Sequence, residues 1–187
     1  MSELKILSVF GTRPEVIKLA PVVMELGRRT ERFISRTCAT AQHRQMLDQA
    51  MQPFKIRADH DLDVMTPGQS LAQVTARVVE RLDGVIAAES PDVVLVQGDT
   101  TTAMCGALAA YYQRVKVGHV EAGLRTGNKF APFPEEINRR LVGQLADLHF
   151  APTEEAKQAL LAEGVAGSKL HHVGSSSLAR PRLVHSA

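Results

Sequence analysis

The sequence predicts an α/β fold built on a doubly wound parallel sheet, and two observations carry that prediction. Short apolar runs alternate with segments of helical period, and this strand-then-helix unit recurs six times along the 187 residues. The run Val93–Val96 is rich in β-branched residues and unbroken by polar ones, which is typical of a strand buried on both faces of a parallel sheet. Because crossovers between parallel strands are right-handed, a doubly wound arrangement is the expected topology.

Two prolines shape the elements expected in the first half of the chain. Pro14 suits the first turn of a helix, where its missing N–H costs nothing, whereas Pro21 lies inside the helical pattern and is expected to kink or restart the helix. The expected elements are strands over Leu4–Phe10 and Phe33–Ala39, a helix from Pro14 to about Gly27, a helix over roughly 45–51, and a short strand near Ile56 within the irregular stretch 52–69.

Helix caps mark the elements of the second half. Ser70 and Thr153 are good N-cap residues, and the acids that begin the helix after residue 134 suit its positive N-terminus. The expected elements are a helix from Leu71 to Val85, the strand Val93–Val96, a helix over Ala103–Ala110, a strand over Val115–Val120, a loop over Thr126–Pro134, a helix over Glu135–Leu145, a strand over Leu148–Ala151, a helix from Thr153 to about Glu163, and a strand over Leu170–Val173.

Composition narrows the function classes. The chain is 44% hydrophobic and 22% charged with a net charge of +2, as in ordinary soluble globular proteins, and a basic stripe with interleaved aromatic residues is missing, which argues against nucleic acid as a partner. The sequence shows neither a signal peptide nor an apolar stretch of membrane-spanning length, so we expect a cytoplasmic protein with no membrane partner. Cys38 and Cys105 are expected to be buried, reduced thiols, and no zinc-ligand spacing is present.

Polar side chains follow the strands at one edge of the predicted sheet. In chain order they are Arg13; Gln42, His43 and Arg44; Asp99; and Glu121 and Arg125. Each has an ordinary interpretation by itself: Asp99 as a helix cap, Glu121 as the ion-pair partner of Arg125, and Arg13 as a surface charge. Because the carboxyl ends of parallel strands meet at one edge, their convergence favours a cleft for an anionic ligand.

The motifs that are missing restrict that ligand. The first strand is not followed by Gly-x-Gly-x-x-Gly, and no phosphate-loop lysine follows Gly98, so nicotinamide binding and nucleotide-triphosphate hydrolysis are disfavoured. His43, His119 and His149 lack metal-ligand spacing, and His119 on a strand is more often a satisfied core residue. Acids and arginines remain, and these suit proton transfer beside a phosphate.

Five segments carry a resemblance to a known family: Phe10–Glu15 (FGTRPE), Thr40–Arg44 (TAQHR), Gln97–Thr102 (QGDTTT), Gly118–Arg125 (GHVEAGLR) and Pro132–Glu136 (PFPEE). In their order and spacing they resemble the bacterial non-hydrolysing UDP-N-acetylglucosamine 2-epimerases. The resemblance implies a B-type glycosyltransferase-like fold with substrate bound between two Rossmann-like domains. Residues 1–174 would form the first domain, 175–187 a divergent and flexible tail, and the second domain would be missing.

The resemblance also implies a reaction and its residues. UDP is eliminated with loss of the proton on carbon 2, and its re-addition with a proton on the opposite face gives UDP-N-acetylmannosamine; no nicotinamide or metal cofactor is needed. By motif position Asp99, Glu121 and Glu135 match the family's catalytic carboxylates, without an assignment of base and acid, and Arg13 and Lys18 match its diphosphate anchors. The resemblance places Gln42, Gln45, Gln69 and Glu136 near an activating second UDP-N-acetylglucosamine. It also implies a homodimer that serves cell-surface polysaccharide synthesis.

Two alternatives stay open from the sequence. The hydrolysing branch of the family, which releases UDP and free N-acetylmannosamine, shares the fold and the glycal intermediate. A non-catalytic module for sugar-nucleotide binding or dimerisation is the other, because a chain with half of the cleft would lose the clamping of substrate that positions it for reaction. For the same reason we expect the chain by itself to fold and to be inactive.

Overall fold

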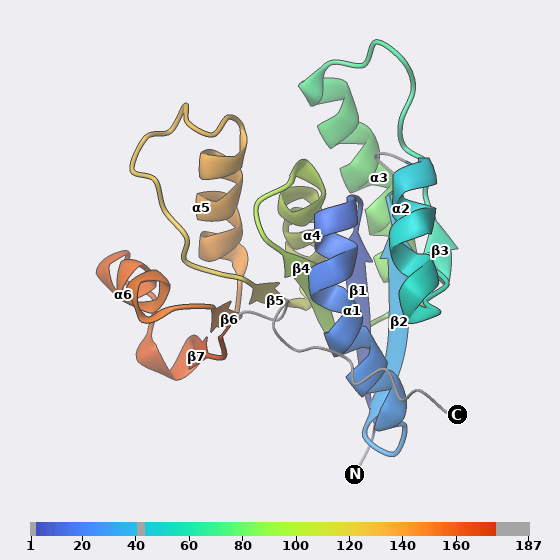
Figure 1. The fold of residues 1–187 in the computed structure, drawn as a ribbon, viewed down its shortest axis with the longest axis horizontal. Coiled ribbons are helices and arrows are strands. Elements are labelled where there is room, and N and C mark those ends of the chain that lie inside the picture. Colours follow the sequence, from blue (N-terminus) through green and yellow to red (C-terminus); the bar gives the residue numbers. More distant parts are fainter. Residues whose placement is uncertain (1–2, 41–43, 175–187) are drawn as a thin grey trace.

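The computed structural model describes residues 3–40 and 44–174, and every strand pair within them is parallel. The strands are β1 (Leu4–Phe10), β2 (Phe33–Ala39), β3 (His60–Asp61), β4 (Val93–Gln97), β5 (Lys116–Val120), β6 (Leu148–Ala151) and β7 (Leu170–His172). Their order across the sheet is β3-β2-β1-β4-β5-β6-β7 (Figure 1). The chain winds outward twice from the centre, from β1 to β3 and then from β4 to β7, which confirms the predicted doubly wound fold.

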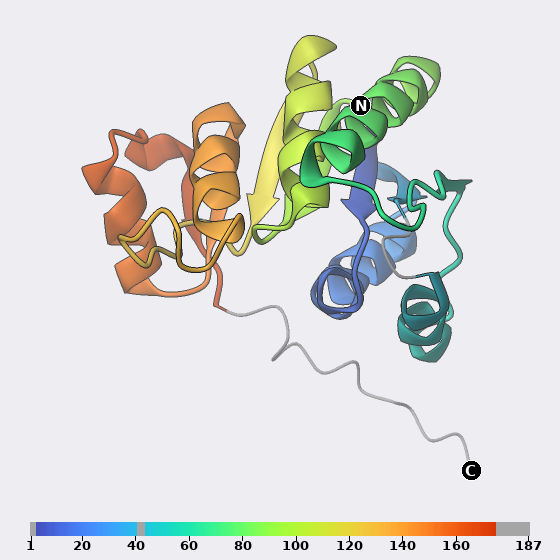
Figure 2. The same ribbon diagram turned by 90° about the horizontal axis from the view of Figure 1, so that it is seen from above.

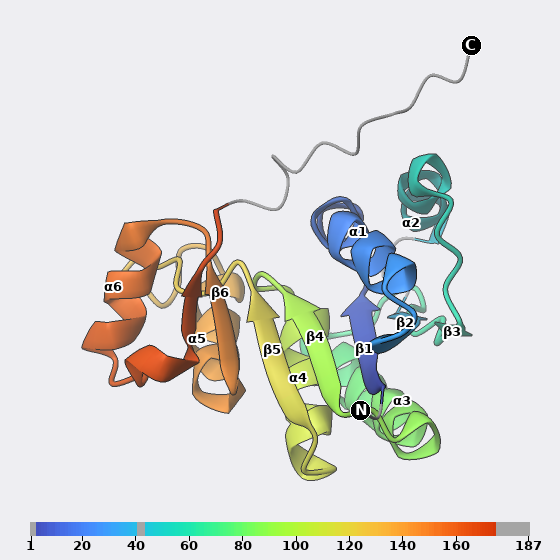
Figure 3. The ribbon, with the colours of Figure 1, turned by 90° about the horizontal axis from the view of Figure 1, so that it is seen from below.

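Helices cover the two faces of the sheet unequally. The α-helices are α1 (Arg13–Arg28), α2 (Arg44–Met51), α3 (Leu71–Glu89), α4 (Thr101–Tyr112), α5 (Glu135–Leu145) and α6 (Glu154–Ala162), and the 3-10 turns are η1 (Gln52–Phe54) and η2 (Gly167–Lys169). Views along the sheet show α1 and α2 on one face, and α3, α4 and α5 on the other (Figures 2 and 3). None of the helices in the described ranges has both the length and the apolarity needed to span a bilayer.

The main core lies on the face covered by α3, α4 and α5. Leu7, Val9, Val94, Val96 and Val117 point from three neighbouring strands into a buried cluster with these helices. The middle helix, α4, is enclosed on most of its surface, since its alanines and its cysteine are fully buried. Small residues let such a helix approach the sheet closely, which explains the run of alanines in its sequence.

The opposite face is covered over only half its width. Phe10, Val16, Leu19 and Leu47 form a second core cluster under α1 and α2. Beyond α1, the described residues place no helix over β4, β5 and β6, and an apolar groove of about 440 Å³ lies there. Side chains that line it from the strands and from α1 include Ile6, Leu95, Val120, Phe150, Val22 and Leu26. Right-handed crossovers explain the asymmetry, because strands added in one direction put their connecting helices on the same face.

The helix caps follow the sequence predictions. Ser70 Oγ accepts a hydrogen bond from Gln73 N at 3.3 Å, and Thr153 Oγ1 accepts one from Ala156 N at 3.2 Å. Pro14 lies in the first turn of α1 as expected. Pro21 does not restart the helix, since α1 continues through it as one element.

The short strand predicted near Ile56 is wrong. Strand β3 lies later, at His60–Asp61, because η1 and the left-handed residue Lys55 (φ 55°) first turn the chain back. Ile56 instead packs against the core cluster under α1 and α2. The carboxylate of Asp59 accepts hydrogen bonds from the backbone N and Oγ1 of Thr37, both at 2.8 Å, and so guides the chain to the edge of β2.

The two cysteines are free and buried, as predicted. Burial raises the pKa of the Cys38 thiol and of the Cys105 thiol to about 12 in each case. At neutral pH both are therefore protonated and unreactive, because the thiolate is the nucleophile.

Replacing Gly123 by alanine should destabilise the protein far more than the same change at Gly127. Both glycines have positive φ, 92° and 79°, so each substitution costs roughly 1–2 kcal/mol in a left-handed conformation. At Gly123 the new Cβ would also lie 2.1 Å from the backbone oxygen of Ala156, so α6 would have to move, whereas Gly127 faces open space. Urea unfolding of the two variants measures the difference, and equal losses would contradict this packing.

Candidate active site

The candidate site lies at the carboxyl ends of β1, β4 and β5, beside the N-terminus of α5. Strands β1 and β4 are neighbours, yet the chain leaves them in opposite directions across the sheet. A crevice forms at such a switch point, where ligands bind in open α/β sheets. The loops after β1, β4 and β5 carry the predicted residues Arg13, Asp99 and Glu121 to this edge.

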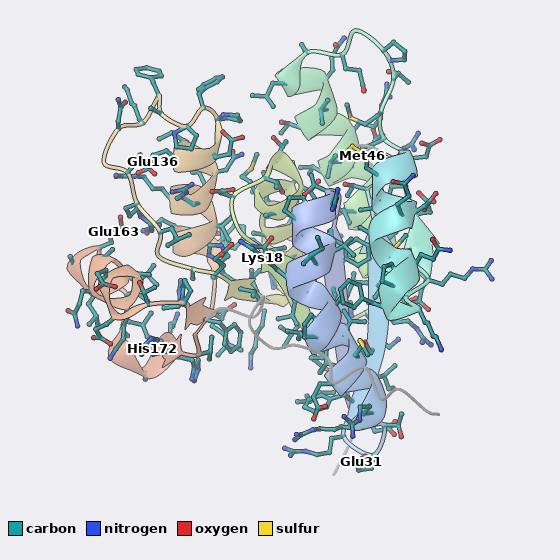
Figure 4. All side chains as sticks on the ribbon, viewed as in Figure 1. Lys18, Glu31, Met46, Glu136, Glu163 and His172 are labelled. Atoms are coloured by element: carbon teal, nitrogen blue, oxygen red, sulfur yellow. The ribbon has the colours of Figure 1, made fainter. Side chains whose placement is uncertain are left out.

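Lys18 and Glu121, predicted as anchor and acid, are brought into direct contact. Lys18 Nζ on α1, labelled in Figure 4, lies 2.5 Å from both carboxylate oxygens of Glu121. Gln97 Nε2 at the end of β4 donates to Glu121 Oε2 at 2.5 Å. Glu121 has a left-handed backbone (φ 64°), an uncommon conformation for a residue other than glycine, which turns the chain sharply after β5. Side chains from α1 and β4 thus converge on the carboxylate that follows β5.

Asp99 is held by α5. Arg139 forms an ion pair with the Asp99 carboxylate, and Asn138 Nδ2 donates to the Asp99 backbone oxygen at 3.0 Å. The interpretation of Asp99 as a helix cap is wrong, since Thr100 is the N-cap of α4 and its Oγ1 accepts from Ala103 N at 3.0 Å. Gly98 makes the turn (φ 69°), which places Asp99 one residue before the cap. Its carboxylate is therefore paired with α5 rather than capping α4.

The two acids that begin α5 have different surroundings. Glu135 is partly exposed, whereas the Glu136 side chain is fully buried. The carboxylate of Glu136, labelled in Figure 4, accepts from Thr126 N at 3.1 Å and from Arg140 Nε at 3.0 Å. The first of these hydrogen bonds holds the loop before α5 to the helix. Burial opposes ionisation of Glu136, but these hydrogen bonds outweigh it and hold its pKa below the usual value. In this conformation the chain's own donors occupy Glu136.

Arg125 does not pair with Glu121, contrary to the alternative that the sequence left open. Its Nε and Nη2 donate to the two carboxylate oxygens of Glu163 at 2.8 and 2.7 Å. This two-point ion pair joins the loop after β5 to the end of α6. The Glu121 carboxylate is consequently left to Lys18 and Gln97.

The remaining predicted residues lie at different distances from this centre. Arg13 is exposed in the first turn of α1. The side chain of Gln69 stabilises the turn that precedes it, since its Oε1 accepts from Thr66 N at 2.6 Å. Gln42 and His43 lie outside the described residues, and only the backbone of Arg44 and Gln45 is described. Residues 3–40 and 44–174 contain no group of three or more acidic, histidine or cysteine side chains placed to hold a metal ion.

One residue that the sequence did not single out for function occupies the base of the site. Glu15 in the first turn of α1 is fully buried, and its Oε2 accepts from Gly11 N at 2.9 Å and Thr12 N at 2.7 Å. Its Oε1 accepts from Thr100 Oγ1 at 2.6 Å. Burial raises the pKa of Glu15, although these hydrogen bonds oppose the rise. The Thr12-x-x-Glu15 spacing of a capping box was the signal that could have marked it.

Comparison with known proteins gives a consistent result. The profile of the family described as UDP-N-acetylglucosamine 2-epimerase matches residues 25–184. A UDP-N-acetylglucosamine 2-epimerase of Bacillus subtilis is 52% identical over 178 residues, which cover 95% of this chain and 47% of that protein. The corresponding enzyme of Escherichia coli K12 is 53% identical over 173 residues, or 92% and 46% of the two chains. The chain thus spans about half the length of the curated relatives it matches.

Solved structures agree with this result. The crystal structure of the UDP-GlcNAc 2-epimerase of Neisseria meningitidis bound to UDP-GlcNAc superposes with a TM-score of 0.91 at 50% identity, covering 94% of this chain and 47% of that one. A lipopolysaccharide outer core galactosyltransferase superposes with a TM-score of 0.66 at 13% identity, over 91% of this chain and 45% of that one. At so low an identity only the fold is shared.

His119 should make the stability of the fold depend on pH. It is fully buried on β5, where Nε2 lies 2.7 Å from the backbone oxygen of Gly98, and burial lowers its pKa from 6.5 to about 4. Between these values the unfolded chain binds a proton that the folded chain does not. The contribution of neutral His119 to the free energy of unfolding should therefore be complete above pH 6.5. As the pH drops toward 4, the free energy of unfolding should fall by roughly 3 kcal/mol.

Urea unfolding at a series of pH values between 7.5 and 4.5 tests this dependence. The variant His119→Asn keeps an N–H donor but does not titrate, so its stability should change less over the range. His171→Asn, which alters an exposed histidine, serves as the control and should retain the slope of the unaltered chain. An unchanged slope in His119→Asn would contradict the assignment.

Proposed function

The chain belongs to the UDP-N-acetylglucosamine 2-epimerase family, and on that premise we propose that its site takes part in interconverting UDP-N-acetylglucosamine and UDP-N-acetylmannosamine. The observation that carries the proposal is the ion pair of Lys18 with Glu121 at the switch point of the sheet, with a second ion pair, Arg139 with Asp99, on the loop after the neighbouring strand β4. Acids and cations gathered at one edge suit proton transfer beside a diphosphate. The ligand of the Neisseria meningitidis structure, UDP-GlcNAc, supports this class of substrate.

The proposed reaction needs carboxylates that transfer a proton and cations that stabilise the diphosphate. Elimination removes the carbon 2 proton and breaks the bond from carbon 1 to the diphosphate oxygen; re-addition of UDP forms that bond again while carbon 2 takes a proton on the other face. Asp99, Glu121 and Glu135 are the candidates for accepting and returning the proton. Arg13 and Lys18 are the candidates for stabilising the negative charge that builds up on the departing diphosphate.

The ion pairs of the site bear on this assignment. Lys18 already neutralises Glu121, and Arg139 already neutralises Asp99. A carboxylate fixed by a cation and by further hydrogen bonds has one orientation, which general acid–base catalysis requires. A diphosphate that approached Lys18 would compete with Glu121 for its ammonium group and leave that carboxylate freer to accept a proton.

The wider proposal concerns the longer protein. We propose that residues 1–174 form one Rossmann-like domain of a two-domain enzyme, with the sugar nucleotide between the domains. A homodimer, an activating second UDP-N-acetylglucosamine near Gln69 and Glu136, and a cytoplasmic role in cell-surface polysaccharide synthesis belong to the same proposal. Residues 175–187 lie outside the described residues.

A hybrid enzyme tests the function. Residues 3–174 replace the part of the Bacillus subtilis relative that they match, and the hybrid is incubated with UDP-N-acetylglucosamine in deuterated water. Separation of the two epimers, with deuterium at carbon 2, is the expected result. Free N-acetylmannosamine as the main product would favour the hydrolysing branch, and an inactive hybrid that still binds the sugar nucleotide would favour a non-catalytic module. The 187-residue chain assayed alone is expected to be inactive.

Replacing Asp99 by asparagine should lower kcat of the hybrid by two or more decades, the usual scale for lost acid–base catalysis. The matched control is Asp92→Asn, because Asp92 precedes the same strand at its opposite end, where it accepts from Lys5 N at 2.8 Å. That variant should keep kcat. Equal kcat values for Asp99→Asn and the unaltered hybrid would remove Asp99 from the reaction.

Replacing Arg13 by alanine should raise KM for UDP-N-acetylglucosamine by roughly 10- to 100-fold, since a charge-assisted hydrogen bond contributes about 1.5–3 kcal/mol. Arg28→Ala, at the far end of the same helix, removes an exposed arginine whose partner is Glu25 and should leave KM unchanged. If the two variants had the same KM, Arg13 would be a surface charge.

A further inference from the structure

We propose that Glu15 is a positioning residue that ties the loop after β1 to the loop after β4, and so holds Arg13 and Asp99 in one arrangement across the cleft. The inference rests on the proposed function, because it concerns residues to which that function assigns the substrate. Glu15 itself is fully buried, so it acts through these neighbours and not by touching the substrate.

The Glu15 carboxylate divides its two oxygens between the two loops. Oε2 accepts from the backbone N–H groups of Gly11 and Thr12, which belong to its own loop. Oε1 accepts from the hydroxyl of Thr100, which lies 85 positions further along the chain. An ordinary capping box uses the glutamate to satisfy the helix end alone. Here the second oxygen instead accepts from the loop that follows a different strand, β4.

The two linked residues adjoin the two residues of the site. Thr12 immediately precedes Arg13, and Thr100 immediately follows Asp99. Consecutive Cα atoms are held about 3.8 Å apart by rigid peptide units, so a shift of Thr12 or Thr100 is passed on to its neighbour. The bond between Glu15 and Thr100 therefore controls the separation of Arg13 and Asp99.

Thr100 has no freedom to exchange this bond for another. Its hydroxyl donates to Glu15 while the same oxygen accepts from Ala103 N, at 2.6 and 3.0 Å. A hydroxyl has one proton to donate, and here that proton is committed to the carboxylate. Rotation of the side chain would break the cap of α4 as well as the link to Glu15.

A second contact packs the same part of the chain together. Thr40 Oγ1 after β2 and Thr102 Oγ1 in α4 lie 2.8 Å apart, and both threonines are fully buried. Gly11 passes between them so closely that a Cβ there would lie 2.2 and 2.3 Å from the two oxygens. The segments that follow β1 and β2 are thus packed against the first turn of α4, the helix that Thr100 caps.

This arrangement also changes how an anion can bind. The N–H groups at the start of a helix commonly bind phosphate, but at α1 Glu15 already occupies the N–H groups of Gly11 and Thr12. These two N–H groups are therefore not available to a diphosphate, and the cationic candidates on α1, Arg13 and Lys18, are carried by the helix whose first turn Glu15 fixes. The position of Glu15 accordingly affects both capture of substrate and the placement of Asp99.

The decisive comparison uses two threonines that cap helices in the same way. Thr100→Ala and Thr153→Ala each remove a hydroxyl that accepts from the N–H three residues later, in α4 and α6 respectively. Only Thr100 is bonded to Glu15. In the hybrid enzyme, Thr100→Ala should lower kcat at least 10-fold and raise KM, since a small misplacement of reacting groups is costly. Thr153→Ala should show a similar drop in melting temperature with unchanged kcat and KM.

Two further variants sharpen the result. Thr100→Ser retains the hydroxyl and should restore both kinetic constants, while Glu15→Gln replaces an acceptor by a donor and should lower kcat at least as much as Thr100→Ala. If Glu15→Gln does not fold, the threonine series decides. The proposal is overturned if Thr100→Ala loses stability like Thr153→Ala but keeps kcat and KM within twofold of the unaltered hybrid.

A measurement on the 187-residue chain separates this inference from the proposed function. Amide NMR spectra of the chain should show faster hydrogen exchange at Gly11 and Thr12, and shifted signals at Arg13 and Asp99, in Thr100→Ala but not in Thr153→Ala. An inactive unaltered hybrid would refute the proposed function while these spectra still tested the link between the loops. Unchanged spectra in Thr100→Ala would refute the link whatever the activity of the hybrid.

Discussion

The parallel pairing of β1 with β4 is the constraint on which the rest of the structure depends. Ile6, Leu7 and Ser8 pair with Val93, Val94 and Leu95, so two segments far apart in the chain form the middle of the sheet. All other strands are added outward from this pair, and the loops at its carboxyl end diverge to opposite faces. The divergence leaves a crevice. The register in which β1, β4 and β5 pair determines which side chains lie at the strand ends that border it.

Charge compensation governs the chemistry of that crevice. Every predicted catalytic acid with a described partner is matched by a cation from a different element, as in Lys18 with Glu121 and Arg139 with Asp99. Pairing of this kind offsets the free-energy penalty of partly burying a carboxylate. It also means that a polyanionic ligand would meet Lys18 and Arg139 already engaged with carboxylates, and would bind to either of them by displacing its present partner.

The sequence predicted the fold more completely than the contacts within the site. Apolar runs and caps such as Ser70 and Thr153 are local signals, so the elements could be predicted in order. Arg125 was matched with the wrong acid because its partner, Glu163, lies on a helix whose position depends on the whole fold. The alternative of Asp99 as a helix cap arose because aspartate suits that position, whereas the left-handed turn at Gly98 decides which residue becomes the cap. Glu15 was missed because its bond to Thr100 is non-local.

The apolar groove beside α1 has a thermodynamic consequence for the described domain. Leu4 and Val173 remain about half exposed, and Val120 and Phe150 face the same open side of the sheet. Apolar surface that water already reaches in the folded state adds nothing to the heat capacity change of unfolding, to which newly exposed apolar surface contributes about 0.45 cal/K/mol per Å². The stability curve of this domain is therefore flatter with temperature than that of a fully covered sheet of the same length. Its stability consequently changes less on cooling below the temperature of maximum stability.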